Sequence, residues 1–202
     1  ELGTGYGQVA ICLLAREPSL QVTGLELVEE AAALARANAA LNHMEDRLAV
    51  VTGSVVDFDG AGGFDVVVSN PPYRTASTHT ASPDPLKAAA TGLQQPLALW
   101  VTCARRALKP EGRLVMILDA RQEAEALDAC TRDALSTVQI LPLLSFDAAP
   151  AKRIVLHAST GTTASVTKLP GLVLHHSDGS WRPELVAVLA KVGALHELSL
   201  SA

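Results

Sequence analysis

Short apolar runs alternate with longer amphipathic or alanine-rich stretches along most of this 202-residue chain. The short runs are rich in Val, Ile and Leu, a composition that is typical of buried strands. The longer stretches repeat their apolar residues at the helical period. This alternation predicts repeated βαβ units, and hence an α/β fold in which a doubly wound, mostly parallel sheet lies between layers of helices.

Local signals place the individual elements. The expected helices are Gln8–Arg16, Val28–Leu41, Leu97–Leu108, Arg121–Leu135 and Pro183–Val192. The expected strands are Gln21–Leu27, Leu48–Thr52, Phe64–Ser69, Arg113–Leu118, Val138–Phe146 and Arg153–Ser159, with one late strand antiparallel to the rest. We expect Gln21–Leu27 to be buried, and three consecutive valines predict that Phe64–Ser69 is buried on both faces. Pro and Gly within Lys109–Gly112 predict a turn.

Two segments depart from this alternation. Arg74–Ala90 is polar, rich in Thr, Ser and Pro, and without a period, which predicts a long loop that is either functional or disordered. Glu1 stands inside a strand-to-helix turn, so we expect the natural N-terminus and a preceding strand to lie upstream of this sequence. No internal repeat or linker is visible, and residues 1–202 are therefore expected to form one domain.

Composition excludes several classes of protein. With 49% hydrophobic and 18% charged residues, the chain is too apolar to be disordered. No window is long and apolar enough for a membrane span, and no secretory signal is visible. Cys12, Cys103 and Cys130 are far apart, which favours free thiols in a reducing compartment and hence a cytoplasmic protein. His175 and His176 would point to opposite faces of a strand, so no metal site is expected.

Charge is distributed unevenly along the chain, whose net charge is −5. Residues 1–69 hold 3 basic and 10 acidic side chains, whereas residues 70–202 hold 13 basic and 11 acidic ones. A polyanionic partner is therefore expected to meet the second part of the chain. The candidate phosphate contacts are Arg74, Lys87, Arg105, Arg106, Lys152 and Arg153.

A glycine-rich turn opens the sequence as Glu1-Leu2-Gly3-Thr4-Gly5-Tyr6-Gly7. Glycines at alternate positions between a strand and a helix let the backbone approach a ligand closely. Glu26 follows 19 residues after Gly7, at the end of the next strand, where a carboxylate can accept hydrogen bonds from both ribose hydroxyls. The pattern favours a nucleotide-type ligand over its alternatives, a sterically demanding turn and an acid that stabilises a helix N-terminus.

A second motif, Ser69-Asn70-Pro71-Pro72-Tyr73, directly follows the expected strand Phe64–Ser69. The side-chain oxygen of Asn70 and the carbonyl of Pro71 can together accept both protons of an amino group, which directs the nitrogen lone pair toward an electrophile. Tyr73 offers a face on which a planar group can stack. The alternative is an Asx–Pro turn at the end of the strand, with Tyr73 as a packing residue.

Taken in order, ELGTGYG, GLELVEE and SNPPY resemble the class I S-adenosylmethionine-dependent methyltransferases that act on amino groups. AKRIVLHAST and LPGLVLHHSDGSWRPELVAVL are similar to the C-terminal part of the small-domain family that includes the tRNA (adenine-N6)-methyltransferases. The resemblance thus covers nearly the whole chain. It implies a Rossmann-like methyltransferase sandwich and S-adenosylmethionine as the cofactor.

The resemblance also implies roles for single residues. The residues implied in cofactor binding are Glu1, Gly3, Thr4, Gly5, Gly7, Glu26, Leu27 and Asn70. In the family, the glycine turn holds the methionine part and the carboxylate binds the ribose. Asn70, Pro71, Pro72 and Tyr73 are the implied catalytic residues, which hold the target amine and stack its base. Ser54 stands where many relatives have an acidic residue near the adenine, and Asp57 is the nearby candidate for that role.

The reaction implied is methyl transfer from S-adenosylmethionine to an exocyclic amino group, with adenine N6 in tRNA as the expected target. Catalysis would then consist mainly of positioning the target amine against the methyl group, since a neutral amine attacks without a general base. An RNA base must leave its stack to enter such a pocket. The alternatives are a protein glutamine, a small molecule, and a non-catalytic module that binds the cofactor.

Overall fold

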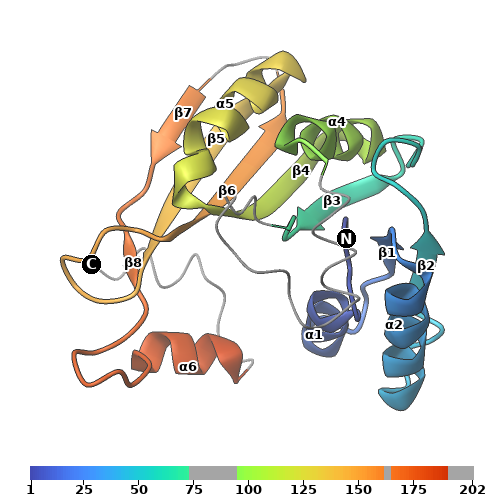
Figure 1. The fold of residues 1–202 in the computed structure, drawn as a ribbon, viewed down its shortest axis with the longest axis horizontal. Helices are drawn as coiled ribbons and strands as arrows, with labels where there is room; N and C mark the ends of the chain where they lie inside the picture. The colour runs from blue at the N-terminus through green and yellow to red at the C-terminus, as the bar shows by residue number, and fades with distance from the viewer. Residues whose placement is uncertain (73–94, 162–164, 191–202) are drawn as a thin grey trace, which may run out of the picture.

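Helices and strands alternate through the first two thirds of the chain and then give way to a run of strands (Figure 1). The computed structural model describes residues 1–72, 95–161 and 165–190. Its helices are α1 (Gln8–Arg16), α2 (Glu29–Leu41), α4 (Leu97–Ala107), the 3-10 turn η1 (Ala120–Gln122), α5 (Glu123–Arg132) and α6 (Pro183–Leu189). Its strands are β1 (Val22–Glu26), β2 (Leu48–Thr52), β3 (Phe64–Ser69), β4 (Leu108–Asp119), β5 (Leu135–Leu144), β6 (Arg153–Thr160), β7 (Ser165–Lys168) and β8 (Leu172–Val173).

The strands form a mixed sheet in two groups. β2 pairs with β1, and the second group has the order β3-β4-β6-β5-β7, with β8 also beside β5. Leu2 lies between the groups, because it forms parallel bridges to Leu25 of β1 and Ser69 of β3. β6 is antiparallel to both β4 and β5, while the other pairs are parallel. The expected mostly parallel sheet with a late antiparallel strand is confirmed.

Helices cover both faces of this sheet, as a doubly wound fold requires. α4 and α5 pack beside each other on one face, and α1 and α2 lie on the other face next to β1 and β2 (Figure 1). The main core lies under α4 and α5, where Leu114, Met116, Leu118 and Leu156 are fully buried. Burying each such side chain stabilises the fold by about 1.5–3 kcal/mol. This packing holds the ends of the strands rigidly.

The parallel direction of the strands brings their carboxyl ends to one edge of the sheet. β1 ends at Glu26, β3 at Ser69, β4 at Asp119 and β5 at Leu144. In open α/β sheets, ligands bind outside this edge. The antiparallel β6 starts here, at Arg153, so its first residues join the same edge.

Burial of the two central strands differs from expectation. Phe64–Ser69 forms a strand at the expected residues, but Val66 remains 39% exposed and only Val67 and Ser69 are buried. Val66 lines a hollow beside β1, so that face of the strand is not covered. Along β1, burial is likewise restricted to its last three residues, Gly24–Glu26.

Three predicted boundaries are wrong. Lys109–Gly112 is a bulge within β4 rather than a turn before it, because Phe64 pairs with Leu108 while Val66 already pairs with Arg113. Arg121–Leu135 is not one helix: Arg121 lies in η1, and α5 ends at Arg132, just before Ala134 takes the left-handed φ of 55°. Leu135 instead begins β5.

The remaining differences lie near the C-terminal end. β7 and β8 were not expected. All four residues of β7 are exposed, so it lacks the apolar alternation of a half-buried strand, and β8 has only two residues. α6 begins at Pro183 as expected and ends at Leu189. The expected final helix also included Lys191 and Val192, which lie outside the described residues. The expected loop Arg74–Ala90 lies outside them as well.

Candidate active site

The glycine turn connects the Leu2 bridge to α1 through a backbone that L side chains rarely adopt. Gly3, Gly5 and Gly7 have φ values of 71°, 55° and 81°. The N–H groups of Gly3 and Thr4 both donate to the carbonyl of Leu25, at 2.9 Å each. Gly7 is the N-cap of α1. The turn is therefore held against the end of β1 with its backbone open to a ligand.

Gly3 and Gly5 are surrounded differently. A Cβ at Gly3 would lie 2.9 Å from Cη2 of Trp100 on α4, a distance that real Cβ contacts essentially never show. A Cβ at Gly5 would meet no atom within 4 Å. Glycine is needed at the first position for packing against the indole, and at the second it leaves space open in front of the turn.

Glu26 is buried at the end of β1 and connects the glycine turn to the start of α2. Its Oε2 accepts a hydrogen bond from the N–H of Gly5 at 2.8 Å, and its Oε1 accepts one from the N–H of Val28 at 3.0 Å. A carboxylate has about four acceptor sites, so both oxygens can accept further hydrogen bonds. The geometry suits a ligand with two adjacent hydroxyl groups.

Glu1 and Thr4 hold the turn from its other side. Oε2 of Glu1 accepts hydrogen bonds from the hydroxyl of Thr4 at 2.6 Å and from the N–H of Ala10 at 3.1 Å. Burial raises the pKa of the Glu1 carboxyl. Thr4 in turn packs on Gly24, where a Cβ would lie 2.9 Å from its side chain. These residues shape the turn and do not line the cavity described next.

A cavity of about 210 Å³ opens between the glycine turn, β1 and the end of β3. Seven of its lining residues were predicted as site residues: Gly3, Gly5, Glu26, Leu27, Ser54, Asn70 and Pro72. Five more predicted residues do not line it: Glu1, Thr4, Gly7, Asp57 and Pro71. Ser54 therefore reaches the cavity where the candidate Asp57 does not.

Six further lining residues were missed by sequence reasoning: Leu25, Val28, Gly53, Val55, Gln95 and Trp100. Most of them are apolar, so the cavity has apolar walls beside Glu26. Trp100 is buried on α4, and its position on the apolar face of that helix is a signal that could have identified it. Gln95 lies two residues before the start of α4, next to its N-cap Pro96, and also lines the cavity.

The Asn70-Pro71-Pro72 segment leaves β3 at the edge of this cavity. The hydroxyl of buried Ser69 donates to the carbonyl of Leu2 at 2.9 Å, which fixes the point where the segment begins. Asn70 is exposed and Pro71 is buried, while Pro72 is half-buried. Tyr73, predicted to stack the target base, lies outside the described residues, as do Arg74 and Lys87.

The cavity fits S-adenosylmethionine by the chemistry of its walls. A buried carboxylate with remaining acceptor sites suits ribose hydroxyls, and the glycine turn presents backbone without side chains. The apolar wall around Val55 suits a planar base. Glu26, Gly3 and Gly5 are therefore the residues that would hold this cofactor.

The candidate phosphate contacts separate into two groups. Arg106 donates to the carbonyls of Val55, Val56 and Phe58, so its guanidinium ties α4 to the connection after β2. Arg105 stands beside it in the last turn of α4, remote from the carboxyl edge. Lys152 and Arg153 lie at the carboxyl edge, where β6 begins.

The described residues contain neither a metal-binding cluster nor a membrane-spanning helix. Within residues 1–72, 95–161 and 165–190, no three His, Cys, Asp or Glu side chains come together in a way that could hold a metal ion. No helix among these same residues has both the length and the apolar character needed to cross a membrane.

Known proteins resemble the chain over most of its length. The methyltransferase small domain family model matches residues 1–142. A tRNA1(Val) (adenine(37)-N6)-methyltransferase from Porphyromonas gingivalis is 32% identical over 200 residues, covering 92% of this chain and 75% of the relative. A release factor glutamine methyltransferase from Deinococcus radiodurans is 39% identical over 153 residues, covering 72% of this chain and 53% of the relative.

The fold also matches solved structures. The crystal structure of a predicted O-methyltransferase from Agrobacterium tumefaciens has a TM-score of 0.78 at 22% identity, covering 96% of this chain and 88% of that one. The match extends through the strands that follow residue 142, beyond the family model. The chain belongs to the methyltransferase small domain family and is an S-adenosylmethionine-dependent methyltransferase.

Proposed function

We propose that this protein transfers a methyl group from S-adenosylmethionine to the exocyclic N6 amino group of an adenine in tRNA. The observation that carries the proposal is that Asn70 and Pro72 line the same cavity as Gly5 and Glu26. The segment that would hold an amine thus borders the space that would hold the cofactor. A tRNA substrate would place the reaction in the cytoplasm.

Asn70 and Pro71 position the amine in this proposal. The side-chain oxygen of Asn70 and the carbonyl of Pro71 accept hydrogen bonds from its two N–H groups, and the nitrogen lone pair is left to attack. S-adenosylmethionine, when bound, supplies an electrophilic methyl group. As the nitrogen gains a carbon–nitrogen bond, the methyl–sulfur bond breaks, the electron pair stays on sulfur, and S-adenosylhomocysteine is the leaving group. The nitrogen then loses one proton to solvent, so no general base is needed. Tyr73 stacks the base, and Pro72 keeps the segment rigid.

The names of the relatives support adenine N6 as the target, because the Porphyromonas gingivalis protein is named for that reaction. The Deinococcus radiodurans relative, named for glutamine methylation, favours a protein glutamine as the second candidate. Both targets are planar NH₂ groups, so the Asn70-Pro71 acceptors suit either. The substrate must therefore be decided by experiment.

Nucleoside mass spectrometry tests the proposal directly. Unmodified tRNA is incubated with the protein and methyl-labelled S-adenosylmethionine, digested, and examined for labelled N6-methyladenosine. An Asn70→Ala variant serves as the comparison, with binding of S-adenosylhomocysteine measured by calorimetry in both proteins. We expect label with the parent protein and its loss in the variant, with a much smaller change in S-adenosylhomocysteine affinity, because Glu26, Gly3 and Gly5 still hold the cofactor.

Two results would contradict the proposal. Full methylation by Asn70→Ala would remove Asn70 from the mechanism. Label absent from tRNA but present in a glutamine-containing peptide would make the second candidate the function.

A further inference from the structure

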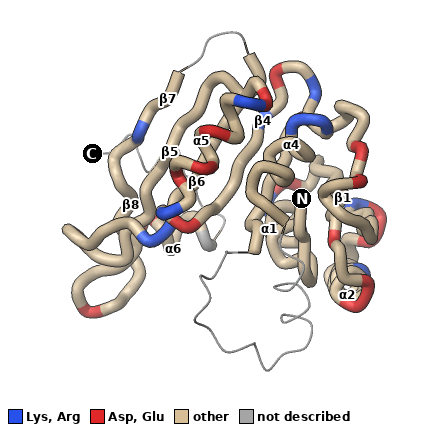
Figure 2. The backbone as a smooth tube through the Cα atoms, turned by 45° about the horizontal axis from the view of Figure 1, so that its top comes forward, with Lys and Arg blue, Asp and Glu red and all other residues tan. Residues whose placement is uncertain are grey.

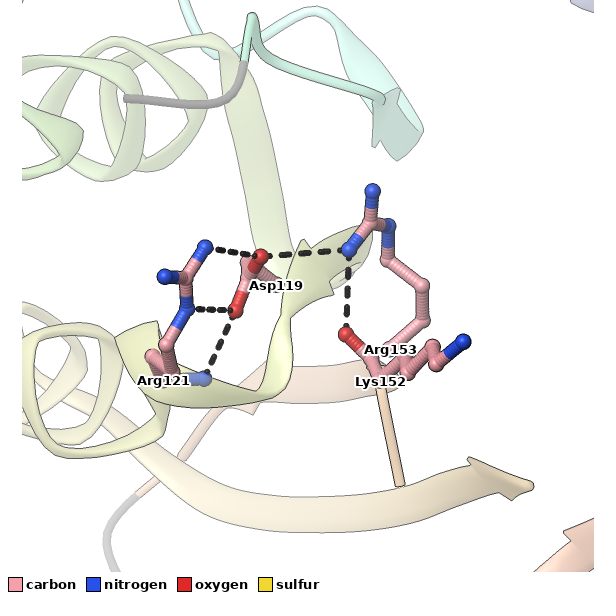
Figure 3. A network of polar contacts seen from close by, with 4 residues as sticks. All are labelled: Asp119, Arg121, Lys152 and Arg153. Carbon is pink, nitrogen blue, oxygen red and sulfur yellow. Dashed lines mark hydrogen bonds and ion pairs between the residues drawn. The ribbon is translucent and has the colours of Figure 1, made fainter. Parts of the chain in front are cut away.

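Two arginines pair with one carboxylate at the carboxyl edge of the sheet, and a lysine adjoins them in the sequence (Figure 3). Asp119, the last residue of β4, accepts hydrogen bonds from Arg121 Nε and Nη2 at 2.9 Å each, and from Arg153 Nη1 at 3.1 Å. Arg153 also donates to the backbone carbonyl of its neighbour Lys152 at 3.0 Å, while the ammonium of Lys152 points away from Asp119 (Figure 3). The three cations and Asp119 are called the basic cluster below.

The basic cluster has a net charge of +2 and faces solvent. The side chain of Arg121 is 79% exposed and that of Arg153 is 37% exposed, whereas Asp119 is mostly covered. Lys152 is exposed. Hydrogen bonds from Arg121 hold the pKa of Asp119 well below its usual range, so the carboxylate stays charged and orients both guanidinium groups. Oriented, exposed guanidinium groups suit phosphate oxygens.

Exposed aromatic rings lie at the same edge. Phe146, just after β5, is 44% exposed, and Trp181 is 50% exposed. The ring of His175 lies between them, with its centroid 5.8 Å from that of Phe146 and 4.3 Å from that of Trp181. The backbone of His175 is itself tied to β5 through a hydrogen bond to the carbonyl of Ser145. These three rings are called the aromatic cluster below.

Strand pairing places the two clusters side by side. Arg153 on β6 pairs with Asp119 of β4 on one side and with Leu143 of β5 on the other. The aromatic cluster starts two residues after the end of β5 and continues beyond β8, which pairs with β5. Neighbouring strands are about 4.8 Å apart. A row of cations and rings therefore extends away from β3, whose end carries Asn70.

Part of the acidic surface of the molecule lies away from this edge. Figure 2 shows acidic segments around α2 and beside β1, with others on α5, whereas basic segments lie near β6 and also near α4, β4 and β7. Cations that follow a backbone, combined with rings on which bases stack, are the features that bind unpaired nucleic acid. An acidic peptide would use the cations and leave the exposed rings without a role.

The geometry points to this edge as the surface that binds unpaired RNA next to the methylated base, which deepens and rests on the proposed function. Arg121, Lys152 and Arg153 contact phosphates, and Trp181 stacks a base a few nucleotides away from the target, because β5 lies three strands from β3. The target base itself enters the cavity beside Asn70, one strand away from the basic cluster.

Fluorescence anisotropy with a labelled, unmodified tRNA transcript tests the cations. The variant is Arg121→Ala with Lys152→Ala, which leaves Arg153 on Asp119. The matched control is Arg132→Ala, an exposed arginine at the C-terminal end of α5, on the opposite edge of the sheet. We expect the double variant to bind about tenfold or more weakly, and its log–log salt slope to fall by about 1.4, since each contact to a single strand contributes about 0.7. The control should match the parent protein.

Tryptophan fluorescence tests the aromatic cluster. Stacking on Trp181 should quench emission when the tRNA transcript is added, and the Trp181→Phe variant should lack that quenching while binding within a few-fold of the parent. Trp181→Leu, which is apolar but cannot stack, should bind about tenfold more weakly. Circular dichroism and melting temperature report whether each variant is folded.

The outcomes separate this surface from the proposed function. If the folded double variant binds the tRNA transcript with the affinity and salt slope of the parent protein, this edge is not the RNA-binding surface, even if tRNA is methylated. Reduced affinity in the double variant with no methylation of tRNA would keep the surface and reject the reaction. A transcript that is neither bound nor methylated, with an acidic glutamine peptide bound instead, would overturn both.

Discussion

Gly3 and Gly5 offer a matched pair of substitutions in one turn. Both residues have a positive φ, of 71° and 55°, so alanine at either position carries the strain of a left-handed L residue. Only at Gly3 does the added Cβ also meet Trp100, at 2.9 Å. At Gly5 it meets nothing within 4 Å and points into space that a ligand would occupy. The two variants should therefore lose different properties.

The magnitudes follow from these surroundings. Left-handed strain costs about 1–2 kcal/mol for an alanine, and overpacking a buried contact costs about 1–3 kcal/mol more. We expect the free energy of unfolding to fall by about 1–2 kcal/mol for Gly5→Ala and by about 2–5 kcal/mol for Gly3→Ala. Gly5→Ala should lower the affinity for S-adenosylhomocysteine about tenfold or more, which is about 1.4 kcal/mol.

Urea denaturation followed by far-ultraviolet circular dichroism measures the free energy of unfolding. Isothermal titration calorimetry measures the affinity for S-adenosylhomocysteine. A double-mutant cycle with Trp100→Phe isolates the overlap, because phenylalanine lacks the outer ring atoms that the Gly3 Cβ would meet. We expect a favourable coupling of about 1–3 kcal/mol between Gly3→Ala and Trp100→Phe. Gly5→Ala should show none.

The reasoning is refuted if Gly5→Ala destabilises the fold as much as Gly3→Ala does. It is equally refuted if Trp100→Phe gives no coupling with Gly3→Ala, or if Gly5→Ala binds S-adenosylhomocysteine as the parent protein does.

Three further predictions concern buried or paired groups. Glu26→Gln leaves one of two backbone N–H groups without an acceptor, so the free energy of unfolding in urea should fall by about 1–3 kcal/mol, and calorimetry should show weaker S-adenosylhomocysteine binding. The pKa of Asp119 is lowered in the folded protein, so its charge stabilises the fold above about pH 4, and this contribution is lost as pH falls. The free energy of unfolding in urea should therefore fall less between about pH 5 and pH 2 for Asp119→Asn than for the parent protein. Burial raises the pKa of Cys130 to about 11 and also raises that of Cys103, so Ellman's reagent should titrate only exposed Cys12 in the native protein and all three thiols in urea.

Much of the candidate site could be predicted because its signals are local. Glycines at alternate positions, a carboxylate at a strand end and an Asn-Pro-Pro segment after another strand are each readable within a few residues. Parallel strands then bring Glu26 and Asn70 to one edge without further information. The structure places both on one cavity with Gly3 and Gly5. The assignment of roles to these residues stays a prediction.

The alternation of apolar runs and helical stretches by itself determined the layered α/β fold, since burial of each element is encoded in its own period. Only the tertiary structure decided which distant segments meet: Trp100 against Gly3, and Asp119 between Arg121 and Arg153. The first contact depends on how α4 packs, and the Asp119–Arg153 pair depends on β6 running antiparallel beside β4. Strand order and helix packing are set by the sum of many long-range contacts, and no local period in the sequence records them.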